Sequence, residues 1–327
     1  MSSTVLVTGG AGYIGSHTVY ALLDRGDKVV VLDNLSTGVQ AQVGKQAVFI
    51  QGDVADSALV RKIITGHDVD AVIHFAGSIV VPESVADPLA YYDNNVVKTR
   101  ALIQTVVEAG VKNFIFSSTA TVYAEDAPQP LAEDMATRPI SPYARSKLMT
   151  EWMLQDVTRA HGLAHAILRY FNVAGADPLG RTGQSNPNAT HLIKRAAMVA
   201  LGRIPRLDIF GTDYPTPDGT GVRDYIHVSD LAAAHLLTLD ALRRGAGSAT
   251  YNVGYGRGLS VRQVVDAVEK VTGKALPVRV SPRRAGDPPT LISDPSRIKA
   301  ALGWKPEHDG IEEIISSAIA WERRFNG

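Results

Sequence analysis

The first half of the chain alternates short apolar runs with longer amphipathic stretches. The runs are rich in β-branched residues and apolar at odd and even positions alike, which is typical of strands buried on both faces of a parallel sheet. They predict strands at Val5–Thr8, Lys28–Leu32, Val48–Gln51, Ala71–Phe75, Asn113–Ser117 and Ala164–Arg169. Helices are predicted between them at Ile14–Arg25, Ser57–Thr65, Leu89–Ala109 and Pro142–His161. This alternation predicts an α/β fold with a doubly wound parallel sheet.

Beyond Phe171 the pattern changes, because segments 177–188 and 213–221 are rich in Pro, Gly and Asn and therefore read as loops. Helices are predicted among them at Leu192–Leu201, Ser229–Arg243, Val261–Thr272 and Ile311–Arg324. We therefore predict two domains: residues 1–172 with the sheet, and a smaller α/β lobe at 173–327, some segments of which return to the first domain. The ligand crevice is expected at the carboxyl ends of the strands.

Composition narrows the class of protein. The chain has 327 residues, 45% of them hydrophobic, which is enough for a full core. Its 33 basic and 33 acidic side chains cancel, so nothing attracts it to nucleic acid or a membrane surface. It has no cysteine, which excludes disulfides, thiolate nucleophiles and cysteine-ligated metals. No apolar stretch of membrane-spanning length and no basic leader are seen, so we expect a cytoplasmic protein without a metal site.

A glycine pattern follows the first predicted strand and opens a helix. Gly9 permits a tight turn, Gly12 lets a pyrophosphate approach the backbone, and Gly15 lets helix and strand pack closely. Asp33 ends the second strand, where a carboxylate accepts hydrogen bonds from an adenosine ribose and repels a 2′-phosphate, favouring NAD over NADP. A plain glycine turn and a turn-capping aspartate are the alternatives. The position directly after a strand favours a Rossmann domain that binds NAD.

Two further strand ends contribute to the predicted cofactor site. Asp53 follows the third strand and is a candidate for the adenine pocket. Phe75, Ala76 and Gly77 follow the fourth strand, where their backbone would lie near the cofactor phosphates and ribose. Both positions are at the sheet edge where the glycine turn is expected.

The candidate catalytic group is a tyrosine, a lysine and a threonine. Tyr143 and Lys147 are four residues apart in a predicted helix, so they lie on one face. An ammonium about 5 Å from a phenol, at an effective dielectric of about 20, lowers the phenol pKa by about two units. Tyr143 is then usable as a base. Thr119 leaves the fifth strand toward the same edge and can bond a substrate hydroxyl. An exposed helix pair and a polar turn are the alternatives.

These motifs resemble a known family. The chain carries Thr8-Gly-Gly-x-Gly-x-x-Gly15, Ser117-Ser-Thr119, Tyr143-x-x-x-Lys147, Arg169-Tyr-Phe-Asn172, Gly219-Thr-Gly-Val-Arg-Asp-Tyr-Ile-His227 and Arg283-Arg-x-Gly-Asp287. Together they are similar to the extended short-chain dehydrogenase/reductases and, within them, to the UDP-glucose (UDP-galactose) 4-epimerase family. The resemblance runs nearly from end to end.

The resemblance implies site residues beyond those argued above. It adds the cofactor contacts Tyr13, Ile14, Asn34, Val54, Asn94 and Phe171 to Asp33, Asp53, Phe75, Ala76, Gly77, Thr119, Tyr143 and Lys147. It places nucleotide-sugar contacts at Asn172, Leu192, Phe210, Arg223, Arg284 and Asp287. Arg223 and Arg284 suit the diphosphate, because guanidinium forks match phosphate oxygens. It also implies a homodimer that pairs Leu89–Ala109 and Pro142–His161 with their copies, for which Leu102, Val106, Leu148 and Trp152 are candidates.

The chain departs from the family at four positions. Thr119 stands where many relatives carry Ser, and the hydroxyl is kept. Ile79 replaces a Lys found after the fourth strand in some relatives. His191 replaces an Asn before Leu192, and Leu291 replaces a Tyr that walls the sugar pocket in some relatives. Leu291 leaves room for an N-acetyl group, so UDP-N-acetylhexosamines are possible secondary substrates.

Competing functions differ in the groups they require. A nucleotide-sugar 4,6-dehydratase needs an Asp-Glu acid pair after the catalytic threonine, and Ala120-Thr121 stand there instead. A 4-epimerase acting on a UDP-pentose or UDP-uronate stays open. A non-catalytic NAD-binding sensor would tolerate loss of the tyrosine–lysine pair, and its retention argues against that class. The expected reaction is NAD-dependent interconversion of UDP-glucose and UDP-galactose through a 4-keto intermediate.

Overall fold

A computed structural model gives the fold of residues 3–186, 189–284 and 287–325. The chain forms two compact units. Unit 1 comprises Met1–Ala124, Ala136–Arg169 and Ala232–Tyr251, and unit 2 comprises Glu125–Met135, Tyr170–Leu231 and Asn252–Gly327. The predicted division was a domain at residues 1–172 and a lobe at 173–327, some segments of which return to the first domain. Segment 125–135 belongs to unit 2, and segment 232–251 returns to unit 1.

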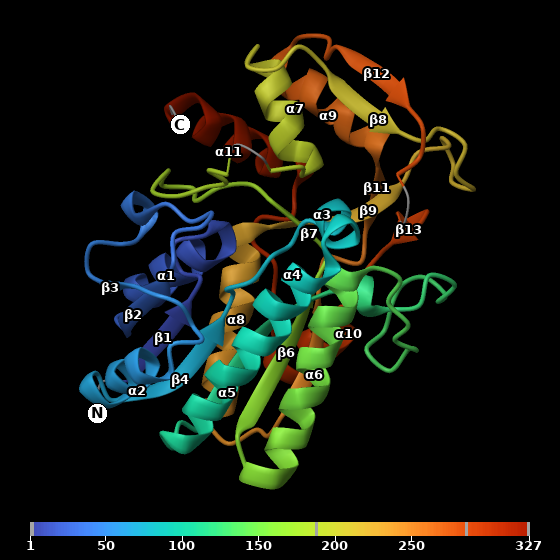
Figure 1. Ribbon diagram of the computed structural model, residues 1–327. Coiled ribbons are helices and arrows are strands. Elements are labelled where there is room, and N and C mark those ends of the chain that lie inside the picture. The colour runs from blue at the N-terminus through green and yellow to red at the C-terminus, as the bar shows by residue number, and fades with distance from the viewer. Residues whose placement is uncertain (1–2, 187–188, 285–286, 326–327) are drawn as a thin grey trace. The chain divides into compact units, whose positions relative to one another are not determined.

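Unit 1 is built on a seven-stranded sheet of order β10-β6-β5-β4-β1-β2-β3 (Figure 1). The strands are β1 (Thr4–Thr8), β2 (Lys28–Asp33), β3 (Val48–Gln51), β4 (Val69–His74), β5 (Asn113–Thr119), β6 (Ala164–Tyr170) and β10 (Ala249–Val253). Pairing from β3 through β1 to β5 is parallel. The chain runs outward from β1 in both directions, so the switch point lies between β1 and β4, where such sheets bind ligands.

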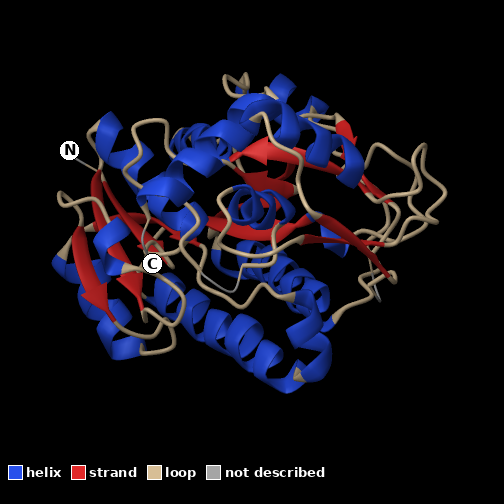
Figure 2. Cartoon of the chain, turned by 90° about the horizontal axis from the view of Figure 1, so that it is seen from above, coloured by secondary structure: helices blue, strands red, loops and turns tan. Residues whose placement is uncertain are grey.

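Helices cover both faces of this sheet, as the helix and strand colours of Figure 2 show. The main ones are α1 (Tyr13–Arg25), α2 (Ser57–Gly66), α5 (Lys98–Glu108), α6 (Pro142–His161) and α8 (Val228–Arg243). Along β1, Leu6 joins a fully buried cluster with Ile63 of α2, Leu102 of α5 and Leu154 of α6. Its neighbours Val5 and Val7 are also fully buried but point to the opposite face. A strand buried on both faces is what the continuous apolar runs predict.

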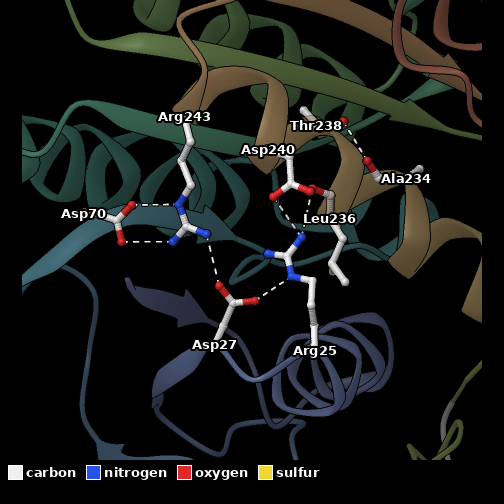
Figure 3. Close-up of polar contacts among 8 residues, drawn as sticks. All are labelled: Arg25, Asp27, Asp70, Ala234, Leu236, Thr238, Asp240 and Arg243. Atoms are coloured by element: carbon white, nitrogen blue, oxygen red, sulfur yellow. Dashed lines mark hydrogen bonds and ion pairs between the residues drawn. The ribbon is translucent and has the colours of Figure 1, made fainter. Parts of the chain in front are cut away.

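An ion network fixes the end of α8 to the sheet (Figure 3). Arg243 makes two bonds to Asp70 of β4, at 2.8 and 2.9 Å, and a third to Asp27 at 3.0 Å. Arg25, the last residue of α1, binds Asp27 and Asp240 of α8. The network therefore joins α1, α8 and the beginnings of β2 and β4. It lies at the amino ends of these strands, whereas the glycine turn follows the carboxyl end of β1.

Helix α6 begins and ends where its sequence directs. The Ser141 hydroxyl accepts a hydrogen bond from the Ala144 amide, and Pro142 occupies the first helical turn. Gly162 ends the helix in the left-handed region with φ 70°. These signals fix the register of the helix that carries Tyr143 and Lys147.

Two predictions for unit 1 are wrong in detail, and one strand was missed. The stretch Leu89–Ala109 contains α4 (Pro88–Tyr92), a π-helical turn at Asp93–Val97 and α5, after a short α3 (Val81–Ala86). The π turn lies where buried Asn95 bonds to both Ser78 and Ser146. Strand β3 lies at the sheet edge and is partly exposed rather than buried. Strand β10 was not predicted, since its five residues lack a distinctive pattern.

Unit 2 contains short strands and a set of packed helices. Strand β9 (Val222–His227) pairs with β11 (Gly258–Ser260), β13 (Thr290–Leu291) and β7 (Asn172–Ala174). A second small sheet pairs β8 (Leu207–Phe210) with β12 (Val278–Ser281). Helices α7 (Leu192–Ala200), α9 (Val261–Thr272) and α11 (Ile311–Arg324) pack on one another, and α10 spans Ser296–Leu302. The predictions of α7, α9 and α11 are confirmed here, whereas α10 and the strands were not predicted.

Candidate active site

The glycine turn after β1 leaves no room for side chains. A Cβ on Gly15 would lie 2.2 Å from the Gly9 carbonyl oxygen. A Cβ on Gly9, whose φ is +71°, would lie 2.6 Å from the backbone nitrogen of Ala76. The turn after β1 therefore touches the turn after β4, at the switch point of the sheet. This is the cradle of bare backbone that a dinucleotide pyrophosphate requires.

The start of α1 is suited to an anion. Gly12 is the N-cap and provides no side-chain cap, and the first turn contains no acidic residue. Tyr13 and Ile14 are its first two residues. Backbone N–H groups and the positive end of the helix dipole then face the glycine turn. These residues fit a dinucleotide phosphate.

Asp33 lies at the end of β2, beside the same turn. Its carboxylate accepts hydrogen bonds from the amides of Ala11 at 3.0 Å and Leu35 at 2.8 Å. These bonds fix its orientation and link β2 to the turn. Asn34 follows, exposed, and accepts a bond from the Ser36 amide. An oriented carboxylate at this point fits a ribose.

Asp53 and Val54 follow the end of β3 and are also candidate cofactor contacts. Asp53 pairs with Lys98 at 2.7 Å and accepts a bond from the Ala55 amide, and both contacts hold the pKa of its carboxyl below the ordinary value although burial opposes them. Val54 is buried beside it. Asn94 donates to the Ser78 hydroxyl, just past Phe75, Ala76 and Gly77. The predicted residues of β3, β4 and the π turn thus lie on adjoining segments of unit 1.

Thr119 and Tyr143 are in contact. Thr119 is 8% exposed at the end of β5, and its hydroxyl is hydrogen-bonded to the Tyr143 phenol. Burial raises the pKa of Tyr143 to about 12, and the bond from Thr119 opposes that rise. The predicted pairing of these residues is therefore present.

Lys147 is buried beside the end of β5. Its Nζ donates to the Ser117 carbonyl at 2.9 Å and lies 4.9 Å from the centre of the Phe116 ring. Burial lowers the pKa of Lys147 to about 8, opposed by the charge of Glu151. The Nζ atom is therefore held at the end of β5, and the effect of its charge on the Tyr143 phenol remains a prediction.

Unit 2 collects several of the predicted nucleotide-sugar residues. Arg223 of β9 is paired in register with Leu291 of β13. Its guanidinium donates to the carbonyls of Val222 and Pro289 and lies 3.9 Å from the Asp287 carboxylate. Asn172 of β7 is paired with Tyr225, two residues along β9. Arg223, Asp287 and Leu291 therefore form one cluster within unit 2.

The remaining residues of unit 2 lie on its second sheet and on α7. The Arg284 guanidinium stands 3.8 Å from the centre of the Phe210 ring, and Arg284 is exposed. Leu192 is the first residue of α7 and His191 is its N-cap. The His191 Nδ1 atom is buried without a hydrogen-bond partner among the described residues. Phe171 also belongs to unit 2, so the predicted cofactor set is divided between the units.

Comparison with known proteins identifies the family. Residues 5–254 match the NAD dependent epimerase/dehydratase family. The chain belongs to this family. It is 55% identical to the UDP-glucose 4-epimerase of Azospirillum brasilense, over 98% of this chain and 92% of the relative.

Two solved structures extend the comparison. UDP-glucose 4-epimerase from Bifidobacterium longum, in complex with NAD+ and UDP, has a TM-score of 0.92 at 40% identity and covers 98% of each chain. The UDP-Glc/GlcNAc 4-epimerase from Campylobacter jejuni has a TM-score of 0.86 at 46% identity, covering 99% of this chain and 100% of that one. The predictions of the family, the α/β Rossmann fold, an epimerase and NAD as cofactor are confirmed. The assignment of single residues to NAD and to the sugar remains a prediction.

Sequence reasoning missed the buried polar groups around Lys147. Glu151 is fully buried and binds Ser118 and Arg169. His74, 1% exposed, bonds to Thr8 and Thr99. The sequence did contain one signal, because Glu151 follows Lys147 at the spacing that separates Lys147 from Tyr143. This member of the NAD-dependent epimerase/dehydratase family thus surrounds its candidate catalytic group with buried charge.

The described residues contain no cluster of three His, Asp or Glu side chains suited to a metal ion. Across those same ranges, no helix is both long and apolar enough to cross a membrane.

Proposed function

We propose that this chain interconverts UDP-glucose and UDP-galactose by removing hydride from carbon 4 of the hexose and returning it to the opposite face. The observation that carries the proposal is the contact of Thr119 with Tyr143, on the helix that also carries Lys147, beside a glycine turn that fits NAD. The 55% identity to a UDP-glucose 4-epimerase supports the substrate pair. Unit 1 would bind NAD, and unit 2 the nucleotide sugar.

Each catalytic residue has a role in this reaction. NAD, when bound, accepts the hydride from carbon 4 and gives it back. Tyr143 takes the proton of the carbon 4 hydroxyl, which leaves a 4-keto sugar, and returns the proton when the sugar is reduced on its other face. Thr119 would hydrogen-bond the same substrate hydroxyl. Because Thr119 also contacts the Tyr143 phenol, it would hold that hydroxyl in position for proton transfer to Tyr143. Lys147 contributes positive charge that favours the phenolate.

Epimerisation requires the keto-sugar to turn while its nucleotide stays anchored. The anchor we propose is Arg223 and Arg284 on the diphosphate, with Phe210 and Leu192 beside the nucleotide. Guanidinium groups bind phosphate oxygens with two parallel hydrogen bonds, which fixes the nucleotide firmly. Asn172, His191, Asp287 and Leu291 would line the hexose side, where few strong contacts are wanted.

The test is turnover of UDP-galactose by the purified protein without added NAD. We expect conversion to UDP-glucose, release of NAD on denaturation, identified by its ultraviolet spectrum, and little stimulation by external NAD, since the cofactor ends each cycle in its starting state. A protein that binds NAD tightly but converts no UDP-sugar would instead support the sensor. Turnover of a UDP-pentose or UDP-uronate in preference to UDP-galactose would favour the open substrate alternatives.

We also propose that the chain is a homodimer. The predicted contacts Leu102, Val106 and Leu148 are buried within unit 1, so they belong to its own core. Other apolar residues of α3, α4, the π turn and α6 are exposed: Val85, Leu89, Val97, Met149 and Trp152. Trp152 at 53% and Leu89 at 77% exposure are large apolar surfaces left in water. Sedimentation should give twice the chain mass of 34.9 kDa, and Trp152→Glu should reduce it to one.

The cytoplasm is the proposed location of the chain, because NAD and UDP-sugars are both available there. Recovery of the enzyme's activity in the cytoplasmic fraction of its own cells would support this, and recovery elsewhere would contradict it.

A further inference from the structure

Glu151 lies one helical turn beyond Lys147 on α6. Tyr143, Lys147 and Glu151 therefore follow one another every four residues along one face of the helix. The Glu151 side chain is 0% exposed, and that of Arg169 is 6% exposed. Its carboxylate accepts hydrogen bonds from the Ser118 hydroxyl, from Arg169 Nε at 3.1 Å and from Arg169 Nη2 at 2.6 Å. Helix α6 is thereby joined to β5 and to β6 by charged hydrogen bonds.

The joined residues are neighbours of the catalytic ones. Ser118 immediately precedes Thr119 on β5, and Ser117 accepts the hydrogen bond from Lys147. The Arg169 guanidinium also lies 4.8 Å from the centre of the Tyr123 ring, beyond Thr119. The end of β5 is therefore joined to α6 at two neighbouring residues, Ser117 through Lys147 and Ser118 through Glu151.

The other titratable groups near Lys147 and on the helices packed against α6 are His74, Glu83 and Tyr91. His74 stacks on Phe116, bonds to Thr8 and Thr99, and burial lowers its pKa to about 3, so it is neutral. On α3 and α4, which pack against α6, Glu83 bonds to the Tyr91 hydroxyl, and burial raises the pKa of Tyr91 to about 12. Glu151 is the carboxylate that acts on Lys147, opposing the burial that lowers the pKa of this lysine.

We propose that Glu151 is a positioning residue for the catalytic tyrosine and lysine. It ties α6 to the strand end that carries Thr119, and its charge keeps Lys147 in the ammonium form. Arg169 balances that charge so that it can remain buried. This inference rests on the proposed epimerase function.

The experiment compares the pH dependence of kcat/KM for UDP-galactose in the NAD-loaded enzyme and three variants. Glu151→Gln removes the charge and keeps the shape, Glu151→Asp keeps the charge, and Asp156→Asn makes the same carboxylate-to-amide change at an exposed site on α6. A charge about one helical turn away, roughly 6 Å, at an effective dielectric of about 20, corresponds to about two pKa units. We expect the alkaline limb of the Glu151→Gln profile to move to lower pH by about one unit or more. The limbs of Glu151→Asp and Asp156→Asn should stay in place.

A purely structural role would lower stability without moving the limb, so an active, NAD-loaded Glu151→Gln enzyme with the wild-type profile overturns the inference. If Glu151→Gln does not fold, Glu151→Asp and Ser118→Ala provide the test. Both variants keep the charge of residue 151 but disturb its hydrogen bond to Ser118 of β5, so kcat should fall several-fold. A wild-type kcat in both variants overturns the inference. A wild type that converts neither sugar overturns the proposed function together with this inference. An active wild type with an unshifted Glu151→Gln profile overturns the inference alone.

Discussion

In unit 1 the candidate catalytic residues Thr119 and Lys147 are buried, whereas in unit 2 the predicted nucleotide-sugar residues are at least partly exposed. Lys147 donates to the Ser117 carbonyl and lies over the Phe116 ring, and the charge of Glu151 acts on its ammonium group. Arg223 also donates to backbone carbonyls, those of Val222 and Pro289, but its side chain is 13% exposed. Arg284 is exposed and rests on the Phe210 ring.

The difference matches what each set must do. Proton transfer needs fixed geometry and a tuned charge, which a dry, hydrogen-bonded surrounding provides. Diphosphate binding needs cations that water and ligand can both reach, and an exposed arginine costs little to keep. In unit 2 the rigid part is the frame: buried Asp224 accepts hydrogen bonds from the amides of Tyr255, Gly256 and Ser293 and so holds β9 to the segments beside it.

The largest effect should come from removing the catalytic phenol. Tyr143→Phe keeps the ring and deletes the hydroxyl that Thr119 contacts. General acid–base catalysis contributes about 10²–10⁴-fold, so we expect turnover of UDP-galactose to fall about 10³-fold or more. Bound NAD, measured after denaturation, should be unchanged. A loss of less than about tenfold would show that another group in unit 1 carries the proton.

The buried network should also dominate stability. Arg169→Met leaves the Glu151 carboxylate buried without its partner, and breaking such a pair costs about 3–5 kcal/mol. The matched control is Arg257→Met, because Arg257 pairs with Asp309 where both side chains are more than half exposed. That change should cost less than about 1 kcal/mol. Urea unfolding followed by circular dichroism measures both, and equal losses would remove the energetic contrast between buried and exposed pairs.

Unit 2 should affect binding more than chemistry. Arg223→Leu removes a cation that we assign to the diphosphate, and a charged hydrogen bond is worth about 1.5–3 kcal/mol. We therefore expect KM for UDP-galactose to rise about tenfold to a hundredfold with a smaller change in kcat. Arg279→Leu is the control, since Arg279 pairs with Asp208 on the neighbouring small sheet. A fall in kcat at unchanged KM would show that Arg223 acts in the chemical step. It would contradict the expectation that unit 2 affects binding more than chemistry.

The pH dependence of the wild type tests the charge on Lys147. Burial lowers its pKa to about 8, so the ammonium is present below that pH and is lost as pH rises through it. If the ammonium is the active form, kcat/KM should fall on the alkaline side near pH 8. Lys147→Arg should be slower but free of this limb, because a guanidinium stays charged. The limb of the wild type persisting in Lys147→Arg would assign it to a different group.

Local signals explain which parts of the fold and site could be predicted. The glycine turn and α6 carry local signals in the sequence, and the structure has both where the sequence placed them. The strands of unit 2 are two to six residues long and pair across large separations, as Arg223 does with Leu291, so no periodicity identifies them. The buried pair of Glu151 and Arg169 depends on the packing of α6 against β6, which the sequence does not display.

The smallest expected effect concerns sugar selectivity in unit 2. Leu291 is half-buried and paired with Arg223, so the side chain at this position lies on the strand next to the proposed diphosphate anchor. Leucine is shorter than tyrosine and has no hydroxyl to fix the ring, so we expect space for an N-acetyl group at carbon 2 of the hexose. The UDP-Glc/GlcNAc 4-epimerase of Campylobacter jejuni is 46% identical to this chain, which makes such a secondary activity worth measuring.

Permitting a larger group adds little binding energy, whereas a steric block can be severe. We therefore expect Leu291→Tyr to leave turnover of UDP-galactose within about threefold and to lower turnover of UDP-N-acetylgalactosamine about tenfold or more. Leu291→Met, which conserves volume, is the control and should leave the ratio of the two rates unchanged. If Leu291→Tyr also leaves that ratio unchanged, another residue of unit 2 sets the limit, and His191, with its buried Nδ1 atom lacking a described partner, is the next side chain to exchange.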